Sequence, residues 1–287
     1  MEGEMTVHIG IFVFETGYSL DTAVLAKRAE DLGYSSFWVP EHGIIPVNTT
    51  SPFPGSPDGV IPQVYYDCVD PFIALARASA VTRDLKLGTG ICLVPERNPI
   101  LLAKEVATLD HYSGGRFMFG IGAGWLKEES EILGGDFSHR WSQTREAILA
   151  MKELWTKDQA EYHGTYYDFP PVYSNPKPVQ KPHPPVILGG KAKNVFNRVV
   201  QYGDGWMPNR TTPDEVGEGR ATIRKLAAEA GRDPDSIMTL VYGTPGDREL
   251  MKAFEGAGVD ECIVRLDTAP EKEALAQLEQ IALAVLK

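Results

Sequence analysis

The feature that most constrains the fold of this chain is a regular alternation of short apolar runs with longer amphipathic segments. Between the runs, apolar residues recur every three or four positions, as Leu25, Ala29 and Leu32 do, which indicates one buried helix face. The apolar runs are residues 7–13, 37–39, 85–92, 117–121, 186–188, 205–207, 236–241 and 262–264. This alternation is typical of parallel α/β proteins.

Residues that begin and end helices flank the amphipathic segments. Asp70-Pro71 and Asn98-Pro99 each place a capping side chain directly before a proline. Ser19 is the expected cap of the first helix, and Gly33 is expected to end it.

Eight strand-and-helix units in strict order predict a closed barrel, because right-handed crossovers bring the eight strands into one ring. An open doubly wound sheet is the alternative, and it needs fewer units and a glycine fingerprint directly after the first strand. The segment 14–18 (Phe-Glu-Thr-Gly-Tyr) lacks that fingerprint. We therefore predict an α/β protein with a single (β/α)8 TIM-barrel domain over residues 1–287.

Two long insertions interrupt the alternation. Residues 43–69 follow the second strand and carry five prolines, so we expect them to overhang the catalytic face, where the loops after barrel strands lie. Residues 157–185 precede the fifth strand and begin at the opposite end of the barrel, so a structural role is expected for much of this second insertion.

Charge and composition exclude several classes of partner. The formal net charge of -11 disfavours binding to nucleic acid and to anionic membrane surfaces. No apolar stretch reaches the roughly 20 residues of a membrane span, and the acidic start 1–4 lacks the apolar core of a signal peptide. A cytoplasmic location is therefore expected. Cys68, Cys92 and Cys262 are isolated from one another in sequence, which fits reduced thiols.

Functional groups of barrel enzymes stand at the carboxyl ends of strands. His42 directly follows the second strand and titrates near neutral pH, so it either handles a proton or a substrate oxygen, or it is a structural histidine bonded to a loop. Glu41 either orients His42 or faces away. Trp125 stacks on a bound ring, walls off the pocket or belongs to the core. Glu128 and Glu129 are expected at the start of a helix, where acidic side chains favour the helix dipole.

Three strand ends are rich in glycine, at 88–90, 120–124 and 189–190. Glycine allows close approach of a planar ligand and positive φ angles, although tight packing and ordinary turns use it equally well. Gly189 and Gly190 precede a helix, so their N–H groups are candidates to hold a phosphate beside Lys191 and Lys193. A plain turn with solvated lysines is the alternative.

Several common catalytic motifs are missing from the sequence. It contains no HExxH, no GxSxG and no GxxxxGK[ST]. The histidines are scattered without the paired spacing of a metal site. A triad hydrolase, a P-loop enzyme and a metal enzyme are therefore poor interpretations.

A set of segments resembles the luciferase-like monooxygenase superfamily, and especially its coenzyme F420-dependent branch. The segments occur in the family order and together cover roughly residues 5 to 210. They are residues 29–42, 87–90, 98–99, 107–110, 113–116, 120–125, 176–180, 189–190 and 203–208. Each is weak alone, and the set is specific.

This resemblance implies a (β/α)8 barrel with an isoalloxazine-type ring in its mouth and a non-proline cis peptide between Gly90 and Ile91 behind that ring. It also places His42 on the histidine that F420 enzymes use near the hydride-accepting carbon. The implied cofactor-binding residues are Gly90, Ile91, Gly122, Gly124, Trp125, Gly189, Gly190, Lys191 and Lys193. Trp125 stands where the sugar-phosphate dehydrogenases carry a glutamate, and Ala123 where light-emitting members carry an arginine. A glucose-6-phosphate-type reaction and a luciferase reaction are therefore disfavoured.

The leading hypothesis is an F420-dependent oxidoreductase that transfers a hydride between the deazaflavin C5 and a small organic substrate. The substrate would lie under residues 43–69, with Phe53, Tyr65 and Tyr66 lining its pocket. One alternative is an FMN-dependent monooxygenase that uses reduced flavin, a partner flavin reductase and O2. The other is a non-catalytic cofactor-binding protein. The resemblance also implies a homodimer formed through helices near the second and third strands.

Overall fold

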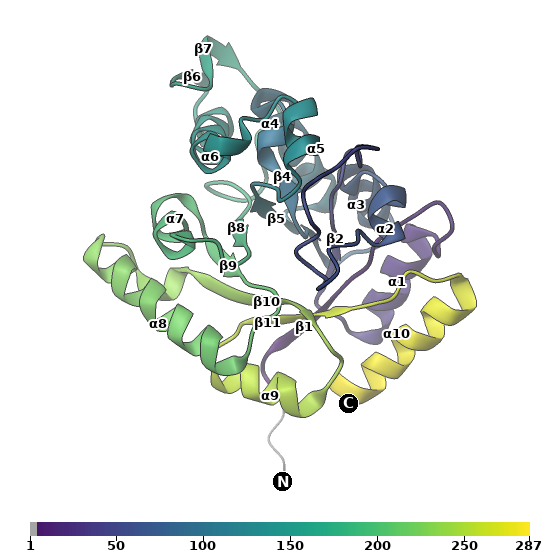
Figure 1. Cartoon of the computed structure of the whole chain (residues 1–287). Coiled ribbons are helices and arrows are strands. Elements are labelled where there is room, and N and C mark those ends of the chain that lie inside the picture. The colour runs from purple at the N-terminus through teal and green to yellow at the C-terminus, as the bar shows by residue number, and fades with distance from the viewer. Residues whose placement is uncertain (1–4) are drawn as a thin grey trace.

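Eight parallel strands close into a barrel (Figure 1), which confirms the predicted (β/α)8 fold. The structure, a computed structural model, describes residues 5–287, so the acidic segment 1–4 lies outside the described residues. The ring closes because β3 pairs with β5 and β1 pairs with β11. The barrel strands are β1 (His8–Phe12), β2 (Ser36–Val39), β3 (Lys86–Thr89), β5 (Phe117–Gly122), β8 (Val186–Gly189), β9 (Gly205–Met207), β10 (Met238–Thr244) and β11 (Glu261–Arg265).

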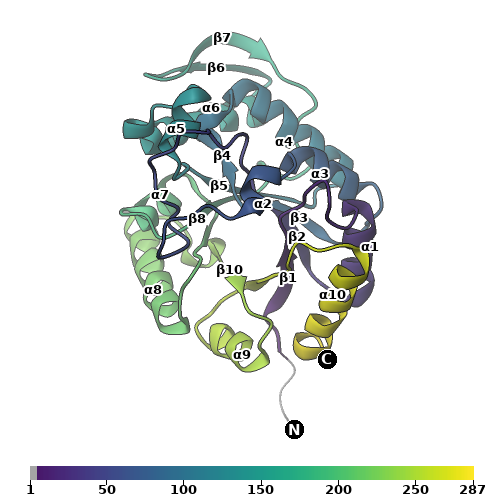
Figure 2. The ribbon, with the colours of Figure 1, turned by 45° about the vertical axis from the view of Figure 1, so that its right-hand side comes forward.

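Eight helices form the outer layer, and one of them follows each barrel strand (Figure 2). They are α1 (Thr22–Leu32), α3 (Pro71–Ser79), α4 (Pro99–Ser113), α6 (Arg140–Thr156), α7 (Val195–Tyr202), α8 (Pro213–Glu229), α9 (Arg248–Gly256) and α10 (Glu271–Val285). Shorter pieces are α2 (Gln63–Asp67), α5 (Lys127–Ile132), η1 (Val94–Glu96), η2 (Phe137–His139) and η3 (Pro234–Ser236). Within residues 5–287, no helix is long and apolar enough to cross a membrane.

The helix caps confirm two of the three expected N-terminal signals. The Asp70 side chain accepts from the Ile73 N–H at 3.0 Å, and Asn98 caps α4 in the same way. The expectation for Ser19 was wrong, because the cap of α1 is Asp21. The Ser19 hydroxyl is instead used in the preceding turn, where it donates to the main-chain carbonyl of Thr16.

Apolar side chains form two layers of core. Inside the barrel they are Phe12, Phe14, Trp38, Met118, Ile187, Met207, Leu240 and Ile263. A larger layer lies between the strands and the surrounding helices. Trp38 is fully buried, and a Cβ on Gly88 would lie 2.2 Å from its ring, so the glycine at position 88 makes room for the indole.

The third predicted strand, residues 85–92, is two strands in the structure. β3 ends at Thr89, and β4 (Cys92–Leu93) pairs with β5. The peptide bond between Gly90 and Ile91, which lies between them, is cis, as the family resemblance implied.

The insertion at residues 157–185 contains an antiparallel hairpin, β6 (Gln159–His163) and β7 (Asp168–Tyr173), which the sequence analysis did not predict. The hairpin packs against α6 outside the barrel (Figures 1 and 2). Only Ala160 and Phe169 of its strands are buried, so the alternation of apolar and polar residues that marks a strand is nearly absent.

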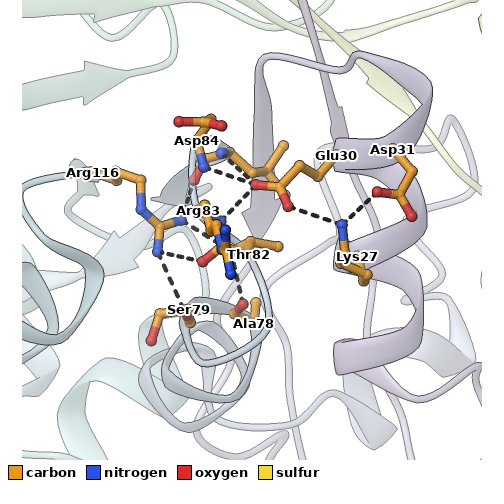
Figure 3. Close-up of polar contacts among 10 residues, drawn as sticks. Lys27, Glu30, Asp31, Ala78, Ser79, Thr82, Arg83, Asp84 and Arg116 are labelled. Atoms are coloured by element: carbon orange, nitrogen blue, oxygen red, sulfur yellow. Dashed lines mark hydrogen bonds and ion pairs between the residues drawn. The ribbon is translucent and has the colours of Figure 1, made fainter.

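A polar network holds the amino-terminal ends of the strands β2, β3 and β5 (Figure 3). Glu30, near the end of α1, accepts from the N–H groups of Arg83, Asp84 and Leu85 at 2.7, 2.8 and 3.1 Å. Arg116, just before β5, donates to main-chain oxygens at the ends of α3 and α4 and before β3. These acceptors belong to Ser79, Thr82, Leu85 and Ser113.

Candidate active site

A pocket of about 380 Å³ opens at the carboxyl ends of the barrel strands. Most of the predicted site residues line this single pocket: His42, Gly90, Ile91, Gly122, Gly124, Trp125, Gly189, Gly190 and Lys191. Lys193 does not line it and lies in a neighbouring cleft instead. The lining residues are spread over the sequence from Phe12 to Arg265, and they meet here because the barrel strands all carry their last residues to the same end.

His42 is held at both ring nitrogens. Its Nδ1 lies 2.6 Å from Oε2 of Glu129, and the indole Nε1–H of Trp125 donates to its Nε2 at 3.3 Å. The His42 side chain is only 6% exposed. The ring is therefore held by Glu129 of α5 and by Trp125, and it also lines the pocket.

Glu129 is a site residue that the sequence analysis missed. It lies in the first turn of α5, as expected, but its side chain is fully buried and accepts from the N–H groups of Gly43 and Ile44 at 2.8 and 3.3 Å. The helix dipole is thus not the main partner of this carboxylate. A signal was present, because Leu126 and Leu133 at positions i−3 and i+4 put Glu129 on the apolar face of α5.

Glu128 bonds the same insertion at a second place. Its carboxylate accepts from the N–H and hydroxyl of Thr50, both at 2.7 Å. The hydrogen bond from the Thr50 N–H is the main reason that the pKa of Glu128 falls to about 2. Adjacent carboxylates of α5 therefore hold residues 43–51, one from inside the protein and one from its surface.

Glu41 does not orient His42. Its carboxylate accepts from the Leu93 N–H at 2.6 Å and forms an ion pair with Arg97. Arg97 also pairs with Asp70 and Glu105, so this cluster ties the end of β2 to the helices α3 and α4. Of the two alternatives for Glu41, the structure shows the one in which it faces away from the histidine.

The insertion at residues 43–69 supplies an aromatic wall. Tyr65, from α2, lines the pocket, with its ring centroid 4.6 Å from Phe14 and 5.1 Å from His42. Phe53 is buried behind it, against Tyr65 and Trp125. Tyr66 is half exposed and is not among the pocket-lining residues. Figure 2 shows this segment passing across the carboxyl ends of the strands.

The glycines at the strand ends serve two purposes. A Cβ on Gly122 or Gly189 would lie 2.0 or 2.7 Å from the side chain of Ile91, so both make room for that isoleucine. Tight packing explains these two positions. Gly124 and Gly190 have φ values of 76° and 85°, and no atom lies within 4 Å of a Cβ placed on Gly190. Only Gly190 leaves open space beside the pocket.

Basic side chains stand at the rim. Lys191, Arg210 and Arg265 all line the pocket. The Lys191 ammonium donates to the Arg210 carbonyl at 2.7 Å and lies 3.3 Å from the Glu215 carboxylate. Lys191 also lines the neighbouring cleft of about 440 Å³ that contains Lys193. The rim and this cleft are continuous. They carry Lys191, Lys193, Arg210 and Arg265 against the carboxylates Glu215 and Glu218, so positive charge prevails there.

Two buried polar atoms near the pocket have no hydrogen-bond partner: the hydroxyl of Tyr242 and Oε1 of Glu96. The Tyr242 ring stacks on Phe12 at 4.1 Å and lines the pocket. Burial, with added repulsion from the Glu129 and Glu41 carboxylates, raises the pKa of Glu96 to about 9. Among residues 5–287, no three His, Cys, Asp or Glu side chains are grouped so that they could hold a metal ion.

The fold and pocket agree with the comparison with known families. Residues 15–246 match the family of luciferase-like monooxygenases. The chain therefore belongs to this family, whose members are oxidoreductases and monooxygenases.

Individual relatives and solved structures are similar to different shares of this chain. An uncharacterized protein of Mycobacterium tuberculosis, Rv0953c, is 36% identical over 283 residues, which cover 96% of this chain and 98% of that protein. The FMNH(2)-dependent dimethylsulfone monooxygenase of Pseudomonas putida is 32% identical over 155 residues, or 53% of this chain and 42% of that enzyme. An F420-dependent secondary alcohol dehydrogenase, in complex with an F420-acetone adduct, has the same fold: the TM-score is 0.77 at 18% identity, over 98% of this chain and 99% of that one.

Proposed function

We propose that this chain is an F420-dependent oxidoreductase that transfers a hydride between the deazaflavin C5 and a small organic substrate. The observation that carries the proposal is the placement of His42, which lines an aromatic-walled pocket at the carboxyl end of the barrel and whose Nε2 accepts from Trp125, another residue of that pocket. A histidine in this position can accept or return the proton that accompanies hydride transfer.

The pocket suits a planar, anionic cofactor. The Tyr242 ring lines the pocket and its buried hydroxyl has no partner, so a bound ring whose carbonyl or nitrogen reached that hydroxyl would satisfy it. The open backbone at Gly190, Lys191 and the cleft that contains Lys193 suit a side chain bearing a phosphate and further carboxylates. When bound, the deazaflavin supplies two-electron hydride chemistry.

The residues of this chain would perform the remaining tasks. Tyr65 and Trp125 exclude water and confine the substrate beside His42. In the direction of oxidation, a substrate hydroxyl would replace the Trp125 indole at His42 Nε2 and give its proton to that atom. In the direction of reduction, His42 Nε2 donates that proton to a substrate oxygen.

An FMN-dependent monooxygenase is the second candidate, and the similarity to the dimethylsulfone monooxygenase favours it. In that case the same pocket would hold reduced FMN, and a separate flavin reductase would have to supply it. The basic rim alone would be enough for a cofactor with one phosphate, such as FMN. A cofactor with several charges, such as F420, would also use the neighbouring cleft, so the cleft is the feature that favours F420.

The test is equilibrium binding of F420 and of FMN to the purified protein, each followed by fluorescence quenching. Micromolar or tighter F420 binding with weak FMN binding is expected. The reverse order would move the protein to the flavin monooxygenases, and turnover with NAD(P)H-reduced FMN and O2 would then be measured. Binding of neither would contradict both candidates, and binding without turnover would support a non-catalytic cofactor-binding protein.

A further inference from the structure

We infer that Glu129 is a positioning residue that decides which ring nitrogen of His42 carries the proton: Nδ1 carries it, and Nε2 is left unprotonated beside the pocket residue Trp125. The inference deepens the proposed function and rests on it for its catalytic consequence. The inference about the tautomer of His42 does not depend on a cofactor and can be tested without one.

The indole of Trp125 identifies the tautomer. An indole N–H is a donor and has no acceptor capacity, and it points at His42 Nε2 from 3.3 Å. The Nε2 atom must therefore present its lone pair. A neutral imidazole with an unprotonated Nε2 carries its proton on Nδ1.

Glu129 provides the matching acceptor. Its Oε2 lies 2.6 Å from Nδ1, and its Oε1 accepts from the Gly43 and Ile44 N–H groups. The three donors converge on one fully buried carboxylate, so its rotamer is fixed by the main chain that follows His42. The hydrogen bond made by one ring nitrogen determines the state of the other, which is how Glu129 acts on Nε2.

The other groups around His42 do not compete for Nδ1. Glu41 is bonded to Leu93 and Arg97. Tyr65 packs its ring against the imidazole, and the Cys68 thiol lies 3.5 Å from the main-chain oxygen of His42, away from the ring nitrogens. The Glu129 carboxylate is thus the acceptor that the structure provides.

The tautomer determines whether Nε2 can accept the proton that the substrate loses during oxidation. In oxidation, the substrate hydroxyl would replace the Trp125 indole at the Nε2 lone pair. Its O–H bond would then break and its proton pass to Nε2, while the hydride would leave the adjacent carbon for the oxidised cofactor and a carbonyl would form. The resulting imidazolium keeps its Nδ1–H bond to Glu129, which stabilises the added charge. With the opposite tautomer, Nε2 already carries a proton and cannot accept another.

Glu129→Gln is the informative substitution, because an amide has only one oxygen. The Gly43 and Ile44 N–H groups require that oxygen, so the amide NH2 is left facing Nδ1 of His42. Nδ1 must then accept, and the ring proton moves to Nε2. Glu128→Gln is the matched control, because Glu128 bonds the same insertion at Thr50 and does not contact His42.

The first readout is the ring protonation state, from ¹⁵N–¹H correlation spectra of histidine-labelled protein without cofactor, with His42→Asn used to assign the signal. The Nδ1–H form is expected in the wild type and in Glu128→Gln, and the Nε2–H form in Glu129→Gln. An Nε2–H ring in the wild type would overturn the inference even if Glu129→Gln failed to fold. An unchanged tautomer in a folded Glu129→Gln protein would also overturn it.

The second readout is kinetic. For Glu129→Gln, kcat should fall about 100-fold, the order expected for general acid–base catalysis, while the Kd for F420 stays within about threefold because no pocket cation is changed. Glu128→Gln should keep kcat within about threefold. Equal losses in both variants would mean that anchoring of the insertion, and not the tautomer, is what matters. Tautomer inversion in a protein that does not use F420 would uphold the positioning role and reject the proposed function.

Discussion

Glu30 and Arg116 at the amino-terminal end of the barrel differ from Tyr242 and Glu96 at its carboxyl end in how completely their polar atoms are hydrogen-bonded. At the amino-terminal end, Glu30 and Arg116 are bonded on nearly every side by main-chain atoms (Figure 3). At the carboxyl end, the Tyr242 hydroxyl and one Glu96 oxygen have no partner. A buried polar group with hydrogen-bond partners stabilises the folded protein, and one without partners destabilises it. The comparison therefore separates the end of the barrel that stabilises the fold from the end that is suited to bind a ligand.

Two glutamates make the contrast quantitative. Burial works against ionisation of Glu30, but the N–H groups of Asp84, Arg83 and Leu85 outweigh it and lower the pKa to about 2. Burial raises the pKa of Glu96 to about 9, and the positive charge of Arg97, which acts in the opposite direction, does not outweigh it. The same side chain is therefore a structural anion at one end and a neutral acid at the other.

The largest expected effect comes from the carboxyl end. His42→Ala should lower kcat by about 100- to 10,000-fold, the usual contribution of a general acid–base residue, and leave F420 affinity within a few-fold. Steady-state turnover and fluorescence titration check this. Unchanged turnover would remove His42 from the mechanism. A large loss of folding stability in His42→Ala would mean that the carboxyl end also stabilises the fold, and that the two ends of the barrel differ less in their roles than proposed.

The next effect belongs to the amino-terminal end. Arg116→Met should lower the free energy of unfolding by about 3 kcal/mol, because the carbonyls of Thr82, Leu85 and Ser113 lose a charged donor. Urea denaturation measures it. The kcat of the folded variant should match that of the wild type. A loss of kcat without a loss of stability would contradict the assignment of a purely structural role to this end of the barrel.

Glu96→Gln should stabilise the protein, and the gain should depend on pH. In the wild type, the unfolded chain ionises Glu96 near pH 4.3, while the folded chain keeps the proton up to a pKa of about 9. Stability from this group is therefore full below the unfolded pKa and is lost as pH rises between these values. The variant should gain about 1–3 kcal/mol at pH 7 and almost nothing at pH 4. Urea denaturation at both pH values would show it, and an equal gain at both would be inconsistent with a neutral Glu96.

The parts of the molecule that could be predicted from sequence are those with local or periodic signals. The barrel follows from the alternation of runs, and the caps at Asp70 and Asn98 follow from residue type. The contact between His42 and Glu129 joins residues 87 positions apart, and no local pattern shows it. The β6–β7 hairpin was missed because its strands are mostly exposed. The prediction that Ser19 caps α1 was wrong because its hydroxyl is used in the preceding turn.

The smallest expected effect compares one hydroxyl from each end. Tyr242→Phe removes an unpartnered buried hydroxyl and should raise the free energy of unfolding by up to about 1 kcal/mol. Thr82→Val removes a hydroxyl that accepts from Arg116 and donates to the Ala78 carbonyl, both at 2.9 Å, and should lower it by about 1 kcal/mol.

The sign of the Tyr242→Phe effect should reverse when cofactor is added. If the hydroxyl donates to the bound ring, the variant loses a hydrogen bond that only the complex makes, and the Kd for F420 should rise about three- to tenfold. Thr82→Val should leave that Kd unchanged, because its hydroxyl lies at the other end of the barrel. Denaturation with and without saturating F420 measures both effects in the same experiment. Equal F420 affinity in Tyr242→Phe and the wild type would mean that the unpartnered hydroxyl serves packing against Phe12 and Gly90 and has no part in holding the ring.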